Sequence, residues 1–124
     1  MENRDRCELC VPKSVLAESE FAYVRLESNS LSRGHVVVVP RRHVPDFFEM
    51  TSPEQMAVVA LLNSARALIQ SRYSPDGYNI GVNIGRAAGQ SRMHVHVHLI
   101  PRYAGDVPNP AGGIRCVLTA KRAA

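Results

Sequence analysis

The sequence predicts an α+β protein with an antiparallel sheet. Three observations support this fold class: several short segments have strand character, one segment has the period of an amphipathic helix, and short connections join them. Strand-like segments also outnumber helical ones. A chain of 124 residues and 13.7 kDa lies in the usual range for one compact domain, so we expect a single domain over residues 1–124.

Two strands are predicted in the first third of the chain. Residues 21–26 have strand character, and the turn-forming residues 27–30 follow them. Residues 35–39 are mainly β-branched and lie between Gly34 and Pro40, which is typical of a buried strand. A short helical turn is expected over residues 44–50.

One long helix is predicted from Ser52 to about Arg72. Ser52 as N-cap, Pro53 at the first helical position and Gln55 three residues after the cap form a capping-box pattern. Apolar side chains fall on one stripe and polar side chains on the opposite stripe, so one helix face should pack on the sheet. The apolar stripe contains Val58, Leu61, Leu62, Ala65, Leu68 and Ile69.

Two more strands are predicted in the second half of the chain. Residues 78–84 alternate apolar and polar side chains, and residues 93–101 form a strong strand pattern after a Gly/Ala loop at 85–89. Residues 102–124 hold Pro108, Pro110, Gly112 and Gly113. We therefore expect this tail to be an extended segment on the surface.

Charge and hydropathy exclude several classes of protein. Fifteen Lys and Arg against eleven Asp and Glu give a net charge of +4, a mild excess that suits an anionic ligand. There is no basic run and no basic helix face with interleaved aromatic residues, so nucleic-acid binding is not expected. There is also no signal peptide and no apolar run long enough for a membrane, so we expect a soluble cytoplasmic protein with reduced cysteines.

Three histidines alternate with apolar residues in the last predicted strand. His94, His96 and His98 should share one face, because successive side chains of a strand point to opposite faces. Two kinds of site fit this pattern: a metal site, or imidazoles that face a phosphate. The outer two histidines of such a strand lie roughly 13 Å apart, at about 3.3 Å per residue, which disfavours three ligands to one ion. We therefore expect the three histidines to divide their roles.

This segment resembles the signature of the histidine triad (HIT) family, His-φ-His-φ-His-φ-φ, in which φ is an apolar residue. It follows the turn Gly89-Gln90-Ser91, and the likeness extends over nearly the whole chain. The matching segments are Cys7-x-x-Cys10, residues 34–43, the capped helix, residues 76–79 and the triad segment. The chain looks most like small bacterial members related to dinucleoside polyphosphate hydrolases. The resemblance implies about five antiparallel strands, with one long helix and a short helix packed on the sheet.

The resemblance also implies an activity. Family members hydrolyse or transfer nucleoside monophosphate groups at an α-phosphorus, through a covalent nucleotidyl-histidine intermediate. By its position in the motif, His96 is the implied nucleophile, and His98 the residue that binds the phosphate or protonates the leaving group. His35 matches an upstream histidine that supports the triad from the neighbouring strand. Alternatively, His35 is a surface residue at a strand end.

Phosphate-binding and ribose-binding residues are implied at two loops. Phosphoryl oxygens would be bound through side chains and backbone N–H groups. The implied phosphate-binding positions are Asn83, Gly89, Gln90 and Ser91. Family members usually place Asp or Asn after the first strand to accept from the ribose hydroxyls. Here Glu27 is aligned at that position and Asn29 is an alternative, so this sequence departs from the family pattern.

Residues from both ends of the chain imply a metal site. Cys7-x-x-Cys10 alone fits zinc, a redox pair or neither. Some family members hold zinc with such a pair, a histidine after the second strand and the first triad histidine, which here are His43 and His94. A closed Cys₂His₂ site has no open position for water, so the implied Zn²⁺ is structural. Cys116 matches no ligand position.

The sequence therefore predicts a nucleotide hydrolase that cleaves a phosphoric anhydride or phosphoramidate bond. The substrate would be a dinucleoside polyphosphate or a related nucleotide conjugate, and the resemblance alone implies a homodimer. Two alternatives stay open. One is a nucleotidyltransferase or phosphorylase that uses the same intermediate, and the other is a non-catalytic nucleotide-binding regulatory module.

Overall fold

Five antiparallel strands form the centre of the protein, in a computed structural model that describes residues 7–118. The strand order across the sheet is β1-β2-β3-β5-β4, and every neighbouring pair is antiparallel. The strands are β1 (Val15–Glu18), β2 (Ala22–Leu26), β3 (Val36–Pro40), β4 (Gly77–Gly81) and β5 (Val97–Arg102), and the long helix is α1 (Ser52–Tyr73). The predicted α+β class with a five-stranded antiparallel sheet is confirmed.

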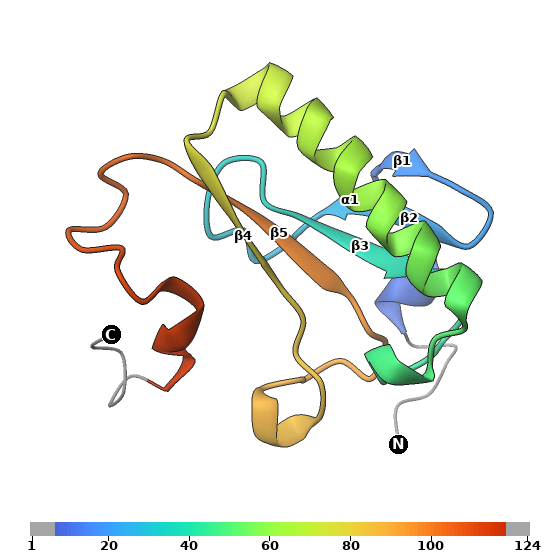
Figure 1. Ribbon diagram of the computed structural model, residues 1–124. Coiled ribbons are helices and arrows are strands. Elements are labelled where there is room, and N and C mark those ends of the chain that lie inside the picture. The colour runs from blue at the N-terminus through green and yellow to red at the C-terminus, as the bar shows by residue number, and fades with distance from the viewer. Residues whose placement is uncertain (1–6, 119–124) are drawn as a thin grey trace.

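Helix α1 covers one face of the sheet (Figure 1). Alternation along the strands brings Val24, Val38 and Val97 into the core cluster that also contains Val58 and Ile69 of the helix. All five side chains are almost fully buried. The predicted apolar stripe of the helix therefore faces the sheet, as its period indicated.

The opposite face of the sheet carries the histidines of interest. The register pairs Val37 of β3 with His98 of β5, so both side chains lie on the face away from α1. At one end of this face the N-terminal segment packs in a second apolar cluster. That cluster contains Cys7, Leu9, Tyr23, Val37 and Val39. The sheet thus holds a hydrophobic core on one side and a polar site on the other.

Three strand boundaries differ from the prediction. The sequence pattern does not reveal β1, because this four-residue strand pairs only with β2 and is mostly half-buried, without alternation. β4 ends at Gly81 instead of residue 84, and β5 begins at Val97 instead of residue 93. Residues 93–96 leave the ladder because the His94 imidazole bonds to the carbonyl of Pro40 at 2.7 Å, while the N–H of Val95 donates to Val44.

The secondary structure of two shorter segments also differs from the prediction. The expected short helix is a three-residue 3₁₀ turn, Phe47–Glu49, capped by the Asp46 carboxylate, which accepts from the N–H of Phe48 at 2.8 Å. The tail is not wholly extended, because Gly113–Val117 forms a 3₁₀ turn that contacts β4. Residues 119–124 of the predicted tail lie outside the described residues.

The helix cap lies one residue earlier than predicted. Thr51, and not Ser52, is the N-cap: its hydroxyl accepts from the N–H of Glu54 at 3.2 Å, and the Glu54 carboxylate accepts from the N–H of Thr51 at 2.8 Å. Both frames read Ser/Thr-x-x-Glu/Gln, so the pattern alone did not separate them. The frame with Glu54 also gains an ion pair with Arg42 at 2.9 Å. In the described residues no helix combines the length and apolar character needed to cross a membrane.

The cap assignment is testable by a matched pair of substitutions. We expect Thr51→Ala to lower the free energy of unfolding by about 1 kcal/mol, because the N–H of Glu54 loses its acceptor. Ser52→Ala should change it by less than about 0.5 kcal/mol, because Ser52 is exposed at the first helical position. Urea denaturation of both variants measures the difference. A larger loss for Ser52→Ala would contradict the assignment.

Candidate functional site

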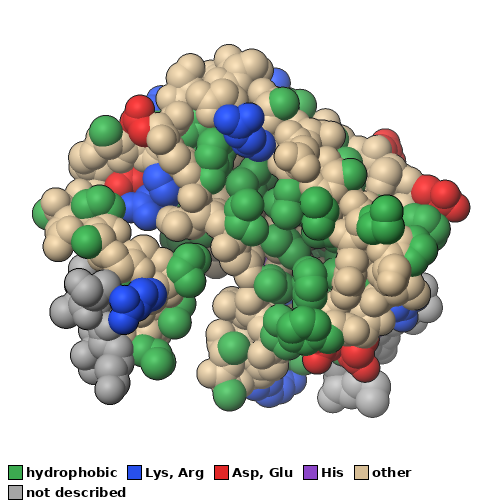
Figure 2. All heavy atoms as spheres, viewed as in Figure 1, with side chains coloured by type: hydrophobic (Ala, Val, Ile, Leu, Met, Phe, Trp, Pro, Cys, Tyr) green, Lys and Arg blue, Asp and Glu red, His purple; other side chains and the backbone are tan. Residues whose placement is uncertain are grey.

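Two adjoining cavities lie on the face of the sheet away from α1. The larger has a volume of about 470 Å³ and the smaller about 150 Å³. Both are lined by Glu27, Asn29, Asn83 and His98. The rim of the larger cavity includes Ile114 of the C-terminal 3₁₀ turn, and Figure 2 shows the surface hollowed between the C-terminal segment and the rest of the molecule. The smaller cavity is lined by Gly89, Gln90, Ser91, Arg92 and His96 in addition to the shared residues.

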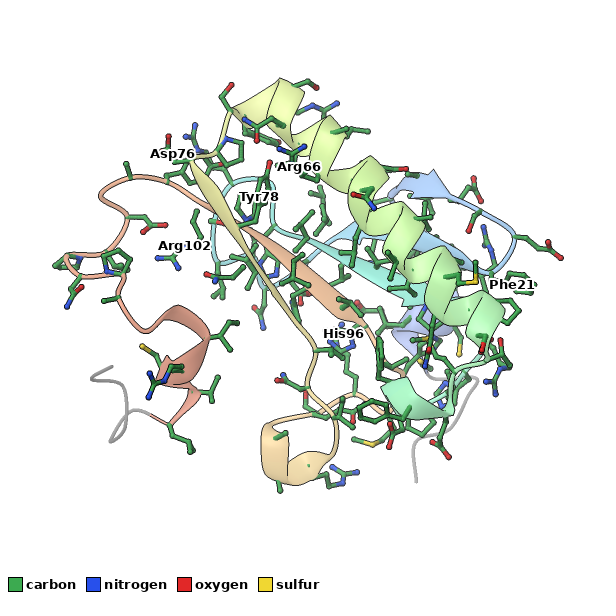
Figure 3. All side chains as sticks on the ribbon, viewed as in Figure 1. Phe21, Arg66, Asp76, Tyr78, His96 and Arg102 are labelled. Atoms are coloured by element: carbon green, nitrogen blue, oxygen red, sulfur yellow. The ribbon has the colours of Figure 1, made fainter. Side chains whose placement is uncertain are left out.

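His96 lies in the smaller cavity with its tautomer fixed by the backbone. In Figure 3 its imidazole lies beside the segment that follows β4. The Nδ1 atom is 2.9 Å from the carbonyl oxygen of His94. A carbonyl only accepts hydrogen bonds, so Nδ1 carries the proton and Nε2 of the neutral ring keeps its lone pair. In this tautomer Nε2 of His96 has the free lone pair that a nucleophile needs.

A chain of hydrogen bonds fixes the tautomer of His98 in the same way. The backbone N–H of Leu31 donates to Nδ1 of His35 at 3.0 Å, so the proton of His35 is on Nε2. Nε2–H of His35 donates to Nδ1 of His98 at 2.9 Å. The proton of neutral His98 is therefore on Nε2, which makes this atom a hydrogen-bond donor. His35 is buried, so the alternative of a surface residue at a strand end is wrong.

The two linked imidazoles are neutral near pH 7. Burial lowers the pKa of His35 below its ordinary value, against a smaller opposing effect of Glu27. Burial, and then the neighbouring His96 and His35, lower the pKa of His98 to about 4. Because His98 is neutral near pH 7, the approach of its Nδ1 to Glu27 at 3.7 Å is not a salt bridge there. The protons of neutral His35 and His98 are therefore on Nε2 in both rings near pH 7.

Glu27 is the carboxylate that both cavities share. Its side chain is only 10% exposed. Burial raises the pKa of Glu27, but the backbone N–H of Asn29 and the nearby His98 and Arg92 lower it by more, so the net pKa lies below its ordinary value. Glu27 is therefore ionised near pH 7 and can accept hydrogen bonds. Asn29 is exposed beside it.

The turn before the triad segment is held by the side chain of Gln90. This residue is 5% exposed, and its Oε1 accepts from the N–H of Gly85 at 2.8 Å. Its Nε2 donates to the carbonyls of Pro45 at 2.7 Å and Arg92 at 3.0 Å. The Gln90 amide is thus already occupied within the loop. Asn83, Gly89 and Ser91 are exposed and line the smaller cavity with it.

Sequence reasoning missed Arg92 and the tail residues of the larger cavity. Arg92 lines the smaller cavity with His96 and His98, and its position between the turn and the triad was the available signal. Ile114 and Val117 line the larger cavity from the tail, which was expected only to be an extended segment on the surface. Their proximity to β4 has no signal in the local pattern.

Cys7, Cys10, His43 and His94 come together at the other end of the same face. Their ligand atoms all lie within 4.8 Å of one another. Sγ of Cys10 is 3.1 Å from Nδ1 of His43, and Sγ of Cys7 is 3.4 Å from Nδ1 of His94. Nε2 of His94 donates to the carbonyl of Pro40, so its Nδ1 has a lone pair for a metal.

The donor set of this cluster fits zinc. Two sulfur and two nitrogen ligands are the usual set of a structural zinc site. Burial, and then the hydrogen bond with Cys10, raise the pKa of the Cys7 thiol to about 11. A cation beside the buried Cys7 thiol would favour its thiolate form, which is the form that binds metal. Cys116 is half-buried and lies outside the cluster.

A second group of possible metal ligands lies in the smaller cavity. Atoms of Glu27, His96 and His98 are also within 4.8 Å of one another. However, Nδ1 of His98 already accepts from His35, and the cation of Arg92 lines the same cavity. These contacts favour an anionic ligand over a metal ion at this position.

Residues 8–105 of the chain match the sequence model of the HIT domain. The chain belongs to the histidine triad (HIT) family. An uncharacterized HIT-like protein of Methanocaldococcus jannaschii is 38% identical to this HIT protein over 96 residues, which are 77% of this chain and 74% of the relative. An AP-4-A phosphorylase of Mycobacterium tuberculosis is 36% identical over 93 residues, 74% of this chain and 48% of the enzyme. A bis(5'-adenosyl)-triphosphatase of Saccharomyces cerevisiae is 33% identical over 94 residues, 75% and 46% of the two chains. This HIT protein thus spans about half the length of the two named enzymes.

Two solved structures share the fold of this HIT protein. A HIT family protein of Bacillus anthracis has a TM-score of 0.75 at 30% identity, over 80% of this chain and 74% of that one. A zinc-bound histidine triad family protein of Mycobacterium smegmatis has a TM-score of 0.75 at 25% identity, over 95% and 94% of the two chains. This zinc-bound relative and the four-residue cluster together indicate a zinc site.

Proposed function

We propose that this HIT protein is a nucleotidyl hydrolase. It would cleave dinucleoside polyphosphates or related nucleotide conjugates at the α-phosphorus, through a covalent nucleotidyl intermediate on His96. The observation that carries the proposal is the hydrogen bond from Nδ1–H of His96 to the His94 carbonyl, which leaves Nε2 as the nucleophile. The two named relatives, a phosphorylase and a triphosphatase of adenosine polyphosphates, support this substrate class.

The reaction proceeds as two displacements at one phosphorus. Nε2 of His96 forms a bond to the α-phosphorus, and the bond from phosphorus to the leaving oxygen breaks. Nε2–H of His98 donates a hydrogen bond to the phosphoryl or leaving oxygen, and a polyphosphate leaves as an anion without taking a proton. Water then attacks the phosphorus and the P–N bond breaks. Nucleoside monophosphate is released, one proton of the water passes to solvent, and His96 is restored.

In this proposal the two cavities take different parts of the substrate. The larger one takes the nucleoside, with Glu27 and Asn29 accepting from the ribose hydroxyls and Ile114 beside the base. The smaller one takes the phosphoryl groups. The phosphate-binding residues are Asn83, Gly89, Gln90 and Ser91. Within this group, Asn83 and Ser91 donate from exposed side chains, whereas Gln90 acts by holding the turn.

The nucleophile assignment predicts the effect of His96→Asn. Asparagine retains an N–H that can donate to the His94 carbonyl but has no nucleophilic nitrogen. We expect turnover of diadenosine tetraphosphate to fall by more than about 10³-fold, while the circular dichroism spectrum and nucleotide binding are retained. Steady-state kinetics and calorimetric titration measure the two effects. Turnover that survives the substitution would contradict the covalent mechanism.

Product analysis with the same substrate separates the proposal from its alternatives. Hydrolysis in ¹⁸O-labelled water should give nucleoside monophosphate that carries the label, at a rate independent of inorganic phosphate. A nucleoside diphosphate that forms only with added phosphate would identify a phosphorylase, the activity named for one relative. Nucleotide binding without turnover would identify a regulatory module.

We also propose that Cys7, Cys10, His43 and His94 hold one structural Zn²⁺. These four residues would join the N-terminal segment to the segment that precedes β5, and with four protein ligands the ion would have a structural and not a catalytic role. His94 serves this site through Nδ1 and orients His96 through its carbonyl. Its Nε2–H remains bonded to the carbonyl of Pro40, which fixes the ring for a ligand.

The metal content of the purified protein tests the zinc site. We expect about one zinc per chain, because two thiolates and two imidazoles close a tetrahedral site. The variant with both Cys7→Ser and Cys10→Ser should lose the zinc and unfold at a lower temperature, whereas Cys116→Ser should keep it. Elemental analysis and thermal unfolding provide the readouts. Full stability of a zinc-free native protein would refute the site.

We further propose that the protein is a cytoplasmic homodimer that uses the free edge of β4 and the helix α1. β4 is an edge strand, and its Ile80 is 53% exposed. On α1, Met56 and Val59 are also exposed apolar side chains. The three described cysteines are unpaired thiols, as the reducing cytoplasm favours.

Sedimentation equilibrium tests the dimer. We expect a mass near twice 13.7 kDa at micromolar concentration. Ile80→Asp should shift the equilibrium toward the monomer, because it places a carboxylate at an apolar edge. The exposed Arg72→Gln is the control and should leave the mass unchanged. A monomeric unsubstituted protein would refute the dimer.

A further inference from the structure

The smaller cavity contains a cation to which the proposed mechanism gives no role. Arg92 lies between the turn at residues 89–91 and the triad segment, and its side chain is 34% exposed. It lines the cavity together with His96 and His98. The guanidinium of Arg92 therefore lines the same cavity as the two imidazoles proposed to act on the phosphoryl group.

The backbone at Arg92 is fixed. Its carbonyl accepts from Nε2 of Gln90 at 3.0 Å, and the same Nε2 donates to Pro45 at 2.7 Å. Oε1 of Gln90 accepts from the N–H of Gly85 at 2.8 Å. The buried amide thus links three loop segments at one point. The Arg92 side chain therefore projects from a residue whose carbonyl is held by the buried Gln90 amide.

The charge of Arg92 is only partly neutralised. Within the described residues its one ion pair is with Glu8, whose Oε1 is 3.5 Å from Nη1 of Arg92. The same Oε1 is 3.3 Å from Nη2 of Arg25. One carboxylate therefore serves two guanidinium groups. Arg25 is buried, and its Nη1 has no hydrogen-bond partner in the described residues, so Glu8 is the nearest compensation for that buried charge.

The positive charge of Arg92 reaches the groups of the cavity. Arg92 contributes to the lowered pKa of Glu27. It also contributes, after burial and the neighbouring histidines, to the lowered pKa of His98. Both effects follow from a cation close to the two side chains. An anion bound in the cavity would be stabilised by the same field.

The arrangement of the two cavities places Arg92 away from the nucleoside. Glu27, Asn29 and His98 line both cavities, whereas Arg92 and His96 line the smaller one alone. A nucleoside in the larger cavity therefore has its α-phosphorus near His96. Phosphoryl groups beyond the α-phosphorus then extend into the part of the site that contains Arg92.

We propose that Arg92 binds the phosphoryl groups of the leaving group and selects polyphosphates over conjugates whose leaving group is uncharged. This assignment rests on the proposed function. Arginine matches phosphoryl oxygens with two parallel N–H donors, which gives both affinity and orientation. Glu8 stays paired with Arg25 when Arg92 turns to the substrate, so no carboxylate is left without a counter-ion.

Substitution at two arginines of the same loop tests the proposal. Arg92→Gln removes the charge from the cavity, and Arg86→Gln removes the same charge from an exposed 3₁₀ turn outside the cavity lining. The substrates are diadenosine tetraphosphate and an adenosine phosphoramidate with a neutral amine leaving group. We expect Arg92→Gln to lower kcat/KM roughly ten- to hundredfold for the polyphosphate, as for loss of a hydrogen bond to a charged group. The phosphoramidate value should fall less than about threefold, and Arg86→Gln should change both values less than about twofold.

Two further measurements make the result decisive. Arg92→Lys keeps the charge and should retain the preference for the polyphosphate with a smaller loss, and circular dichroism checks the fold of each variant. Equal losses for the two substrates, or no loss with Arg92→Gln, would overturn the selectivity of Arg92 while the proposed function stands. An unsubstituted protein that neither binds nor cleaves either nucleotide would overturn both.

Discussion

The hydrogen bond between Nδ1–H of His96 and the carbonyl of His94 is the contact on which the two sites depend. It fixes the tautomer of His96, and therefore decides which nitrogen has the lone pair. The peptide that provides the carbonyl belongs to His94, whose ring is held by Pro40 and faces both cysteines. One residue thus joins the cysteine cluster to the candidate nucleophile through main-chain geometry.

The sheet holds this arrangement in place because one of its faces packs in the hydrophobic core while the other carries the histidines. Val97 and Leu99 pack in the core beneath α1, so the strand is anchored on one side. His98 is left on the other side, within hydrogen-bond distance of His35, which immediately precedes β3. A register shift of one residue would exchange these faces. The valine-rich core therefore also fixes the positions of the imidazoles.

Several features of the site were predictable because they depend on local periodicity. The alternation of residues 93–101 gave the shared face of His96 and His98, and the spacing argument gave a division of roles with His94. The boundary of β5 was not predictable, since it depends on the bond between His94 and Pro40, 54 residues apart. The position of the helix N-cap was ambiguous for a related reason. The ion pair between Arg42 and Glu54 favours the capping box that begins at Thr51.

The sequence by itself determined the fold class and the shared face of the triad segment, because these follow from period and spacing, whereas the residues expected at both sites came from its resemblance to the HIT family. Only the tertiary structure decided the tautomers of His94 and His98, because their partners Pro40 and His35 lie 54 and 63 residues away in the chain. It also decided that Gln90 holds a loop and that Glu8 serves both Arg25 and Arg92. Such contacts join residues that no local sequence pattern relates, so they form only when the strands and loops have assembled.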